Sequence, residues 1–140
     1  MKISFRFIKL ISKVHVFVYK ASRGMIGKNI GVTVILLTTI GRKSGRRRTI
    51  PLAAIPDGEN FFVVASFGGS PIAPSWLFNV KENPNIEISF GHTRQAKRAT
   101  IITSSHPRYT QLWEKALSTY QGFGRYQQAT ARSIDLVTID

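Results

Sequence analysis

Residues 32–55 read VTVILLTTIGRKSGRRRTIPLAAI, and this stretch decides the fold class. Its first part, Val32–Thr39, is rich in β-branched and aliphatic side chains, which favours a buried strand. Gly41–Gly45 predicts a turn, because glycine adopts backbone conformations that other residues avoid. Arg48–Ile55 predicts a second strand, with Pro51 at a sheet edge or a bulge, because proline cannot donate to a strand ladder. The stretch therefore predicts two strands joined by a basic turn.

The rest of the chain continues this pattern of short strands and adds helices. A turn is expected at 56–60 and a loop at 67–74. Further strands are expected at 61–66, 86–90, 94–103 and 134–139, and helices at 75–82, from Pro107 to Tyr120, and at 121–132. About six short, mainly antiparallel strands with flanking helices predict an α+β fold, a small β-barrel closed by helices. No linker or repeat interrupts residues 29–140, so we expect one domain there.

The N-terminal segment, residues 1–28, is expected to form a basic amphipathic helix. Within residues 2–23, apolar side chains at 3, 7, 11, 14 and 18 follow one stripe, while basic side chains at 2, 6, 9, 13 and 20 gather opposite. One interpretation is a surface helix packed on the body of the protein. The other is a helix that rests on an anionic membrane surface.

Charge is distributed unevenly along the chain. The 140 residues include 20 Lys and Arg against 7 Asp and Glu, and a hydrophobic content of 43% suffices for a core. No acidic residue precedes Asp57, whereas twelve basic residues do. Such a field attracts anions, which include phosphates, carboxylates, nucleic acid and acidic lipids. Composition alone does not choose among them.

Several classes of chemistry are excluded by composition. The chain has no cysteine, which removes disulfides and thiolate chemistry. Its histidines, His15, His92 and His106, show no spacing typical of metal ligands, so no metal is expected. No apolar run is long enough to span a bilayer. Lys9 and Lys13 interrupt what would be the apolar part of a secretory signal, so a cytoplasmic protein is expected.

The turn Gly41–Arg48 is the strongest candidate for a binding site. It places five cationic side chains within a short segment, between glycines that let the backbone approach a ligand closely. Backbone N–H groups together with Arg and Lys bind phosphate or carboxylate. A solvated hairpin tip is the competing interpretation. Nucleic acid is not expected as a partner, because no aromatic side chains alternate with these charges.

Three further features could carry chemistry. The adjacent glycines in Ser66–Ser70 form either a plain turn or a surface on which a planar ring or phosphate rests. Trp76 is either a core residue or part of a cleft. Tyr120, Phe123 and Tyr126 recur at intervals of three, as packing residues or as the lining of a substrate pocket. Because no catalytic constellation of side chains stands out, an enzyme of this sequence would borrow its reactive group from a cofactor.

Taken in order, these segments resemble the deazaflavin (coenzyme F420)-dependent nitroreductase family. The matching segments are LLTTIGRKSG at 36–45, RTIPL at 48–52, VASFGG at 64–69, PSWLFNVKENP at 74–84, and the aromatic segment 120–126. The resemblance covers about residues 30–138, in order and at the family's spacing. It implies a split β-barrel of the flavin-reductase-like kind.

The resemblance also implies an activity and a set of site residues. The implied reaction moves a hydride from reduced coenzyme F420 to a small-molecule electron acceptor such as a quinone or nitroaromatic. Matching positions that would hold the coenzyme's phosphate and oligoglutamate tail are Arg42, Lys43, Ser44, Gly45 and Arg48. Those that would shape the cleft around its ring are Pro51, Ala65, Ser66, Ser75 and Trp76. Tyr120 and Tyr126 would face the acceptor.

Two positions depart from the family pattern. Arg47 stands where the family often has proline, and Phe123 stands where tyrosine is common, which removes one hydroxyl from the acceptor pocket. The alternatives are a basic module that binds coenzyme, membrane or nucleic acid without turnover, a member that binds FMN or haem, and a storage protein for the deazaflavin. Barrels of this type often pair, so a homodimer is also an open expectation.

Overall fold

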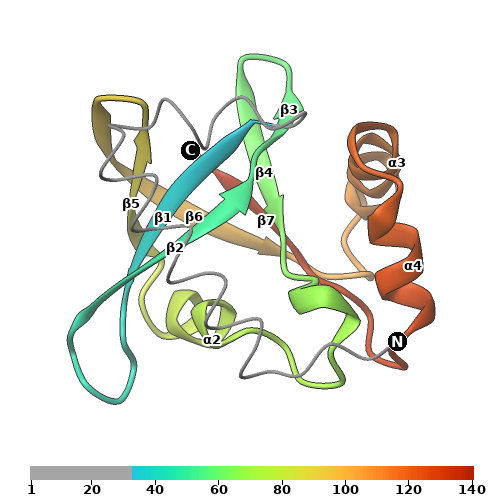
Figure 1. Ribbon diagram of the computed structural model, residues 1–140, viewed down its shortest axis with the longest axis horizontal. Helices are drawn as coiled ribbons and strands as arrows, with labels where there is room; N and C mark the ends of the chain where they lie inside the picture. The colour runs from blue at the N-terminus through green and yellow to red at the C-terminus, as the bar shows by residue number, and fades with distance from the viewer. Residues whose placement is uncertain (1–32) are drawn as a thin grey trace.

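Seven antiparallel strands form one curled sheet in the computed structural model, which describes residues 33–140 (Figure 1). Their order across the sheet is β2-β1-β5-β6-β7-β4-β3. The strands are β1 Val34–Ile40, β2 Arg47–Ala53, β3 Ile55–Asp57, β4 Asn60–Val64, β5 Asn85–Phe90, β6 Thr93–Ile102 and β7 Leu136–Ile139. The expected small barrel is confirmed, with seven strands in place of about six. The helix expected at residues 2–23, and with it the segment 1–28, lies outside the described residues.

A single residue, Ala54, connects the two edges of this sheet. β2 and β3 stand at opposite ends of the strand order, yet only Ala54 separates them along the chain. The edges must therefore lie close together, because consecutive Cα atoms are about 3.8 Å apart. The single strand expected at 48–55 is thus wrong: it is two strands that pair with different neighbours. The turn expected at 56–60 shrinks to residues 58–59, with Gly58 at a φ of 64°.

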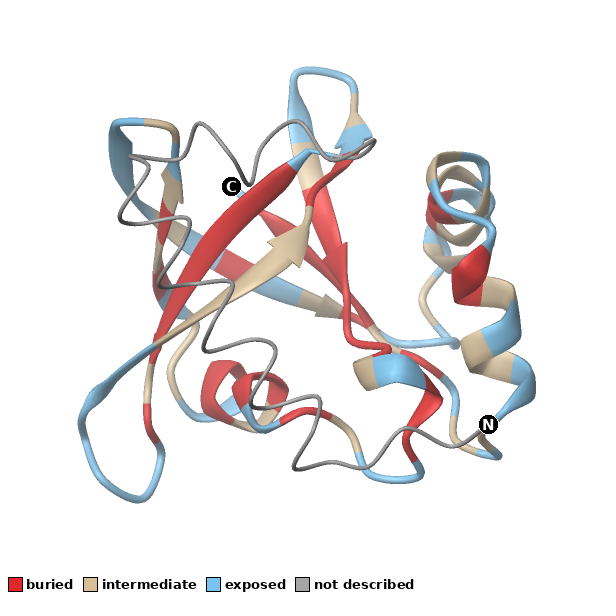
Figure 2. Ribbon diagram, in the orientation of Figure 1, coloured by how far each residue is buried: buried red, intermediate tan, exposed pale blue. Residues whose placement is uncertain are grey.

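Three helices pack against this barrel within residues 33–140 (Figures 1 and 2). They are α2 Ser75–Glu82, α3 Tyr109–Thr119 and α4 Gly122–Gln128, and a 3-10 turn spans Phe67–Gly69. α4 is shorter than the helix expected at 121–132, because the chain leaves the helix after Gln128 and becomes irregular before β7. None of the helices in the described residues is long and apolar enough to cross a membrane.

Side-chain alternation divides the apolar residues into two clusters. Along β4, Val63 faces a cluster inside the barrel that includes Trp76 and Leu77 of α2. Its neighbour Phe62 faces a second cluster that contains Leu112 of α3. Helix α2 therefore packs on the inner cluster, whereas α3 and α4 pack on the second cluster, on the other face of the sheet.

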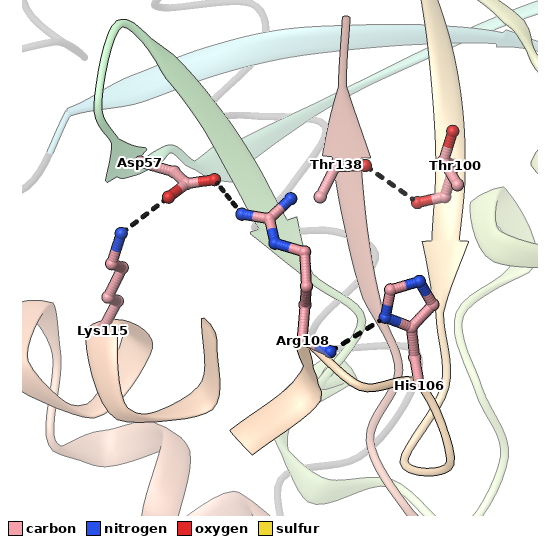
Figure 3. A network of polar contacts seen from close by, with 6 residues as sticks. All are labelled: Asp57, Thr100, His106, Arg108, Lys115 and Thr138. Atoms are coloured by element: carbon pink, nitrogen blue, oxygen red, sulfur yellow. Dashed lines mark hydrogen bonds and ion pairs between the residues drawn. The ribbon is translucent and has the colours of Figure 1, made fainter. Parts of the chain in front are cut away.

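A charged network attaches the β3–β4 hairpin to α3 (Figure 3). Asp57 accepts hydrogen bonds from Lys115 at 2.6 Å and from Arg108 at 2.7 Å. These bonds lower the pKa of the Asp57 carboxyl below its ordinary value. The bond from Lys115 has the larger effect, and the bond from Arg108 the next. The backbone N–H of Arg108 also donates to His106 Nδ1 at 3.0 Å, which orders the entry into α3.

We expect Asp57→Asn to lower the free energy of unfolding by about 1 kcal/mol at neutral pH, since both cations are partly exposed. The folded pKa of Asp57 is depressed, so its contribution is present above the ordinary carboxyl range. It disappears as the pH falls below about 4 towards the lowered folded pKa. Denaturant titrations at several pH values measure this difference. Glu59→Gln, in the same hairpin, is the control and should change the free energy of unfolding little. If Asp57→Asn were still less stable than wild type in acid, the stabilising role of the ionised Asp57 carboxylate would be contradicted.

Candidate functional site

The basic turn between β1 and β2 is closed by its own backbone. The N–H of Gly41 donates to Arg46 O at 2.7 Å, and the N–H of Gly45 donates to Gly41 O at 2.8 Å. Gly45 has a φ of 69°, which glycine adopts without strain. A Cβ on Gly41 would lie 2.6 Å from Ser44 Oγ, and that hydroxyl accepts a bond from the N–H of Arg46. The turn therefore presents its exposed cationic side chains from a defined backbone.

A buried amide, that of Asn79 in α2, fixes this turn to the barrel. Asn79 is 4% exposed, and its Oδ1 accepts from the backbone N–H of Arg42 at 3.1 Å and from Arg42 Nη1 at 3.3 Å. Its Nδ2 donates to Thr39 Oγ1 at 3.1 Å. Arg42 also donates to the carbonyl of Ser75 at 3.5 Å and lies over the ring of Phe78. Sequence reasoning gave Asn79 no role, although a polar residue among the apolar positions of α2 was the available signal.

The cations of the turn differ in what they contact. Arg47 donates to Glu87 of β5 at 2.8 Å, which gives this departure from the family pattern a structural partner. The side chains of Lys43, Arg46 and Arg48 make no ion pair within residues 33–140. These cations are thus available to an anion, since unpaired cations in a defined geometry attract phosphate and carboxylate.

Strand register separates the predicted coenzyme residues of β2. Arg48 pairs with Thr39, whose hydroxyl contacts Asn79, so Arg48 shares the face of the hairpin on which α2 lies. Pro51 is three residues further and therefore points to the opposite face. A hollow of about 280 Å³ occupies part of that opposite face, lined by Leu36, Thr38, Arg47, Thr49, Ser89 and Arg94. The structure brings Arg42 and Ser75 into contact on the α2 side and places Pro51 away from them.

The other residues predicted to surround the coenzyme ring are largely buried. Ala65 is fully buried and Trp76 is 6% exposed, both in the inner cluster, so Trp76 is a core residue here. Ser66 is buried at the end of β4, while Ser75 is exposed at the first turn of α2. Sequence reasoning missed Arg132, whose guanidinium donates to the carbonyl of Ser66 at 2.8 Å. No local pattern around Arg132 signals this contact, which joins residues 66 positions apart.

Tyr120 and Tyr126, which the family resemblance implies would face the acceptor, lie together. Their hydroxyl oxygens are 3.2 Å apart, and Phe123 packs edge-on against Tyr120 from a buried position. A Cβ on Gly122 would lie 2.2 Å from the Tyr120 ring, so glycine leaves room for this ring. Burial, and then the bond to Tyr120, raise the pKa of Tyr126 to about 12. A tyrosine is neutral at pH 7 at its ordinary pKa, and the raised pKa extends the neutral range of the Tyr126 hydroxyl to higher pH.

We expect Tyr120→Phe to lower the pKa of Tyr126 from about 12, because the variant removes the hydroxyl bond that helps to raise it. The pKa should stay above the ordinary tyrosine value, because burial is the larger cause. NMR of ¹³C-labelled tyrosine rings over a pH series measures this directly. Tyr109→Phe is the matched control, since Tyr109 donates to Ile134 O instead. An unchanged Tyr126 titration in Tyr120→Phe would disprove the bond between the two hydroxyls.

The parts of the candidate site follow one side of the molecule. In Figure 1 the turn between β1 and β2 lies at the lower left, helix α2 at the lower centre, and α4 at the right. Cations thus gather at one end of this side and the paired tyrosines at the other. No group of three or more His, Asp or Glu in the described residues is arranged to hold a metal ion.

Comparisons with known proteins identify the family of this chain. The family model described as "F420H(2)-dependent quinone reductase" matches residues 11–140. An F420H(2)-dependent quinone reductase of Mycobacterium tuberculosis is 33% identical over 130 residues, which are 91% of this chain and 87% of the relative. The solved structure of an F420-H2 dependent reductase, FDR-A, is 32% identical with a TM-score of 0.68, over 76% of this chain and 93% of that one.

A second solved structure, described as a domain-swapped dimer, is 29% identical with a TM-score of 0.69. The match covers 92% of this chain and all of that chain (100%). Together with the family match, these similarities confirm the split-barrel fold and the resemblance to deazaflavin-dependent reductases. The chain belongs to the F420H(2)-dependent quinone reductase family.

Proposed function

We propose that this protein binds reduced coenzyme F420 at the basic turn and reduces a small oxidised acceptor, a quinone in the first instance. The observation that carries the proposal is the turn itself, which is closed by its backbone and fixed by Asn79. Its cations Lys43 and Arg48 make no ion pair with any described residue. Family membership supports the choice of coenzyme and of acceptor class. Nitroaromatic acceptors are the second choice.

The residues present fit a coenzyme with a phosphate and a carboxylate-rich tail. Arg42, Lys43 and Arg48 would bind these anions, and the Ser44 hydroxyl and Gly45 would add polar contacts at the turn. The acidic side chain of Glu87 contacts this turn, and it forms an ion pair with Arg47 at 2.8 Å. No described carboxylate pairs with Lys43 or Arg48, so none competes with the ligand.

The remaining predicted residues would form the walls of the site. Ser75 lies at the start of α2, where its carbonyl accepts from Arg42 of the turn, and Ser66 follows β4. Ala65 and Trp76 pack together in the core. Rigid, apolar packing behind a wall excludes water and keeps the wall in place. Pro51 contributes through the course of the β2 backbone, since its side chain points to the other face.

The bound coenzyme would supply a hydride donor, which no side chain of this protein provides. The protein's own residues align the two ligands and polarise the acceptor. Tyr120 and Tyr126 would donate hydrogen bonds to an acceptor oxygen, which strengthen as negative charge develops there. Phe123 is buried beneath the pair, so this trio contributes two hydroxyls.

We expect wild-type protein to quench the coenzyme's fluorescence saturably at low salt. Lys43→Ala and Arg48→Ala should each raise the coenzyme Kd about tenfold or more, because each removes a charge-assisted contact. Tyr126→Phe should leave the Kd nearly unchanged and lower turnover with a soluble quinone. Arg98→Ala, which removes an exposed cation from β6, is the control for net charge.

No saturable binding by the wild type would overturn the proposal. Equal losses of affinity in all three variants would remove the separate roles given to the turn and the tyrosines. Tight binding without quinone or nitroaromatic turnover would favour the alternative of a coenzyme-binding or storage protein. An absorption spectrum of the purified protein distinguishes the alternatives with bound FMN or haem.

We also propose that residues 2–23 contact an anionic membrane surface, which would place a cytoplasmic enzyme at the membrane's inner face. The proposal rests on the opposed apolar and basic stripes of that segment. Full-length protein should co-sediment with vesicles that contain anionic lipid, and the double variant Lys9→Glu/Lys13→Glu should do so much less. Binding that ignores both lipid charge and these substitutions would rule the membrane role out.

A homodimer is proposed on the similarity to a structure described as a domain-swapped dimer. Sedimentation velocity at micromolar concentration gives the mass in solution. A monomer across the whole concentration range used in the assays would dismiss the dimer without affecting the coenzyme site.

A further inference from the structure

Arg132 directs its whole guanidinium at the backbone of one loop. It lies in the irregular segment between α4 and β7. Nε donates to Ser70 O at 2.9 Å, Nη1 to Ala65 O at 3.2 Å, and Nη2 to Ser66 O at 2.8 Å. The planar fork of a guanidinium can satisfy three such acceptors at once, whereas the ammonium of lysine is a point charge. Arg132 makes no ion pair among the described residues.

The loop that Arg132 contacts has an unusual backbone. Phe67, Gly68 and Gly69 have φ values of 44°, 63° and 78°, so three consecutive residues adopt left-handed conformations. This conformation is disfavoured for phenylalanine and persists only where the surroundings hold it in place. Within the loop, Gly69 N–H donates to Ser66 O at 3.0 Å and Ser70 N–H to Phe67 O at 3.1 Å. Arg132 adds three bonds from outside the loop.

Arg132 is in turn attached to α4. Gln127 of α4 donates from Nε2 to Arg132 O at 2.8 Å, and its Oε1 accepts from the N–H of Ile134 at 3.0 Å. The loop also touches α4 directly, because a Cβ on Gly69 would lie 2.7 Å from Tyr126 O. The loop, the segment around Arg132 and α4 therefore form one connected unit, and α4 carries Tyr126.

We propose that Arg132 is a positioning residue that sets the loop of residues 65–70 at a fixed place relative to Tyr120 and Tyr126. The inference rests on the proposed function, in which Ser66 lines the coenzyme side and the tyrosines line the acceptor side. Arg132 acts through the backbone of the coenzyme-side wall, whose carbonyls at Ala65 and Ser66 it contacts. It holds the two walls in register, so its loss misaligns coenzyme and acceptor, while the anion-binding turn, on other elements, is left intact.

This role predicts a specific kinetic signature. Arg132→Ala should lower kcat with a soluble quinone by about tenfold or more, because small misplacements of reacting groups are costly. The coenzyme Kd should change by less than about threefold, because Lys43 and Arg48 still bind the tail. Arg48→Ala should show the reverse pattern. Arg98→Ala, an exposed arginine of β6, is the matched control and should retain wild-type values for both.

Chemical rescue separates positioning from general destabilisation. Millimolar methylguanidine should restore much of the kcat of Arg132→Ala, whereas methylammonium should not, since only the former reproduces the planar fork. Arg132→Lys should remain impaired for the same reason. Amide hydrogen exchange across residues 66–70 should accelerate in Arg132→Ala and slow again with methylguanidine, with the exchange of the β1–β2 hairpin unchanged.

Wild-type kcat in Arg132→Ala or Arg132→Lys would overturn the proposal. So would a loss of kcat without rescue and without faster exchange at residues 66–70, which would indicate a general structural effect. If wild-type protein fails to bind the coenzyme, the proposed function fails. The exchange measurements would then still decide whether Arg132 holds the loop.

Discussion

The covalent connection through Ala54 is the constraint on which the rest of the structure depends. It joins strands that stand at opposite edges of the seven-stranded sheet, so the sheet must curl until those edges meet. Within the described residues, β2 pairs only with β1 and β3 only with β4, which leaves the barrel split at this point. The curl places Ala65, just after β4, in the inner cluster with Trp76 of α2, and α2 is the helix to which the basic turn is attached.

Polar side chains hold the loops of the candidate site, whose backbone groups are not paired in the sheet. Asn79 and Arg132 have similar roles on different elements, because each binds backbone groups of a loop from outside that loop. A buried polar group that loses its partner costs about 1–3 kcal/mol, so each contact favours one loop conformation strongly. Partial burial lowers the pKa of Arg132, and the nearby charge of Asp135 partly offsets this effect. The carbonyl oxygens that accept from its guanidinium compensate for the water it loses. The site is therefore built from loops that behave as rigid parts.

The sequence predicts elements whose signals are local and misses those set by distant contacts. β1 and α2 follow from an aliphatic run closed by Gly41 and from a helical segment that stops before Pro84. The break at Ala54 has no glycine or other turn residue to mark it, because pairing with two different strands produces it. The pairing of Tyr120 and Tyr126 could be predicted, since both lie within one short segment. The contacts of Arg132 could not, because they span more than 60 positions.

The charges of the described residues separate the two functions of the site. Glu87 is engaged by Arg47, and Asp57 by Lys115 and Arg108, so these carboxylates lie with cations that are not assigned to the coenzyme. The cations of the turn that make no ion pair with a described residue attract a polyanion without competition from a carboxylate. Salt screens this attraction beyond about 8 Å. At the other end, the hydroxyl of Tyr126 is uncharged around neutral pH, as for an ordinary tyrosine, and its pKa of about 12 extends this neutral range to higher pH. A neutral donor binds a neutral acceptor without a strong competing charge, and its hydrogen bond strengthens only as the acceptor becomes negative. In the proposed function, separating fixed charge from neutral donors would let one small barrel bind an anion tightly and still favour the reduced form of an uncharged acceptor.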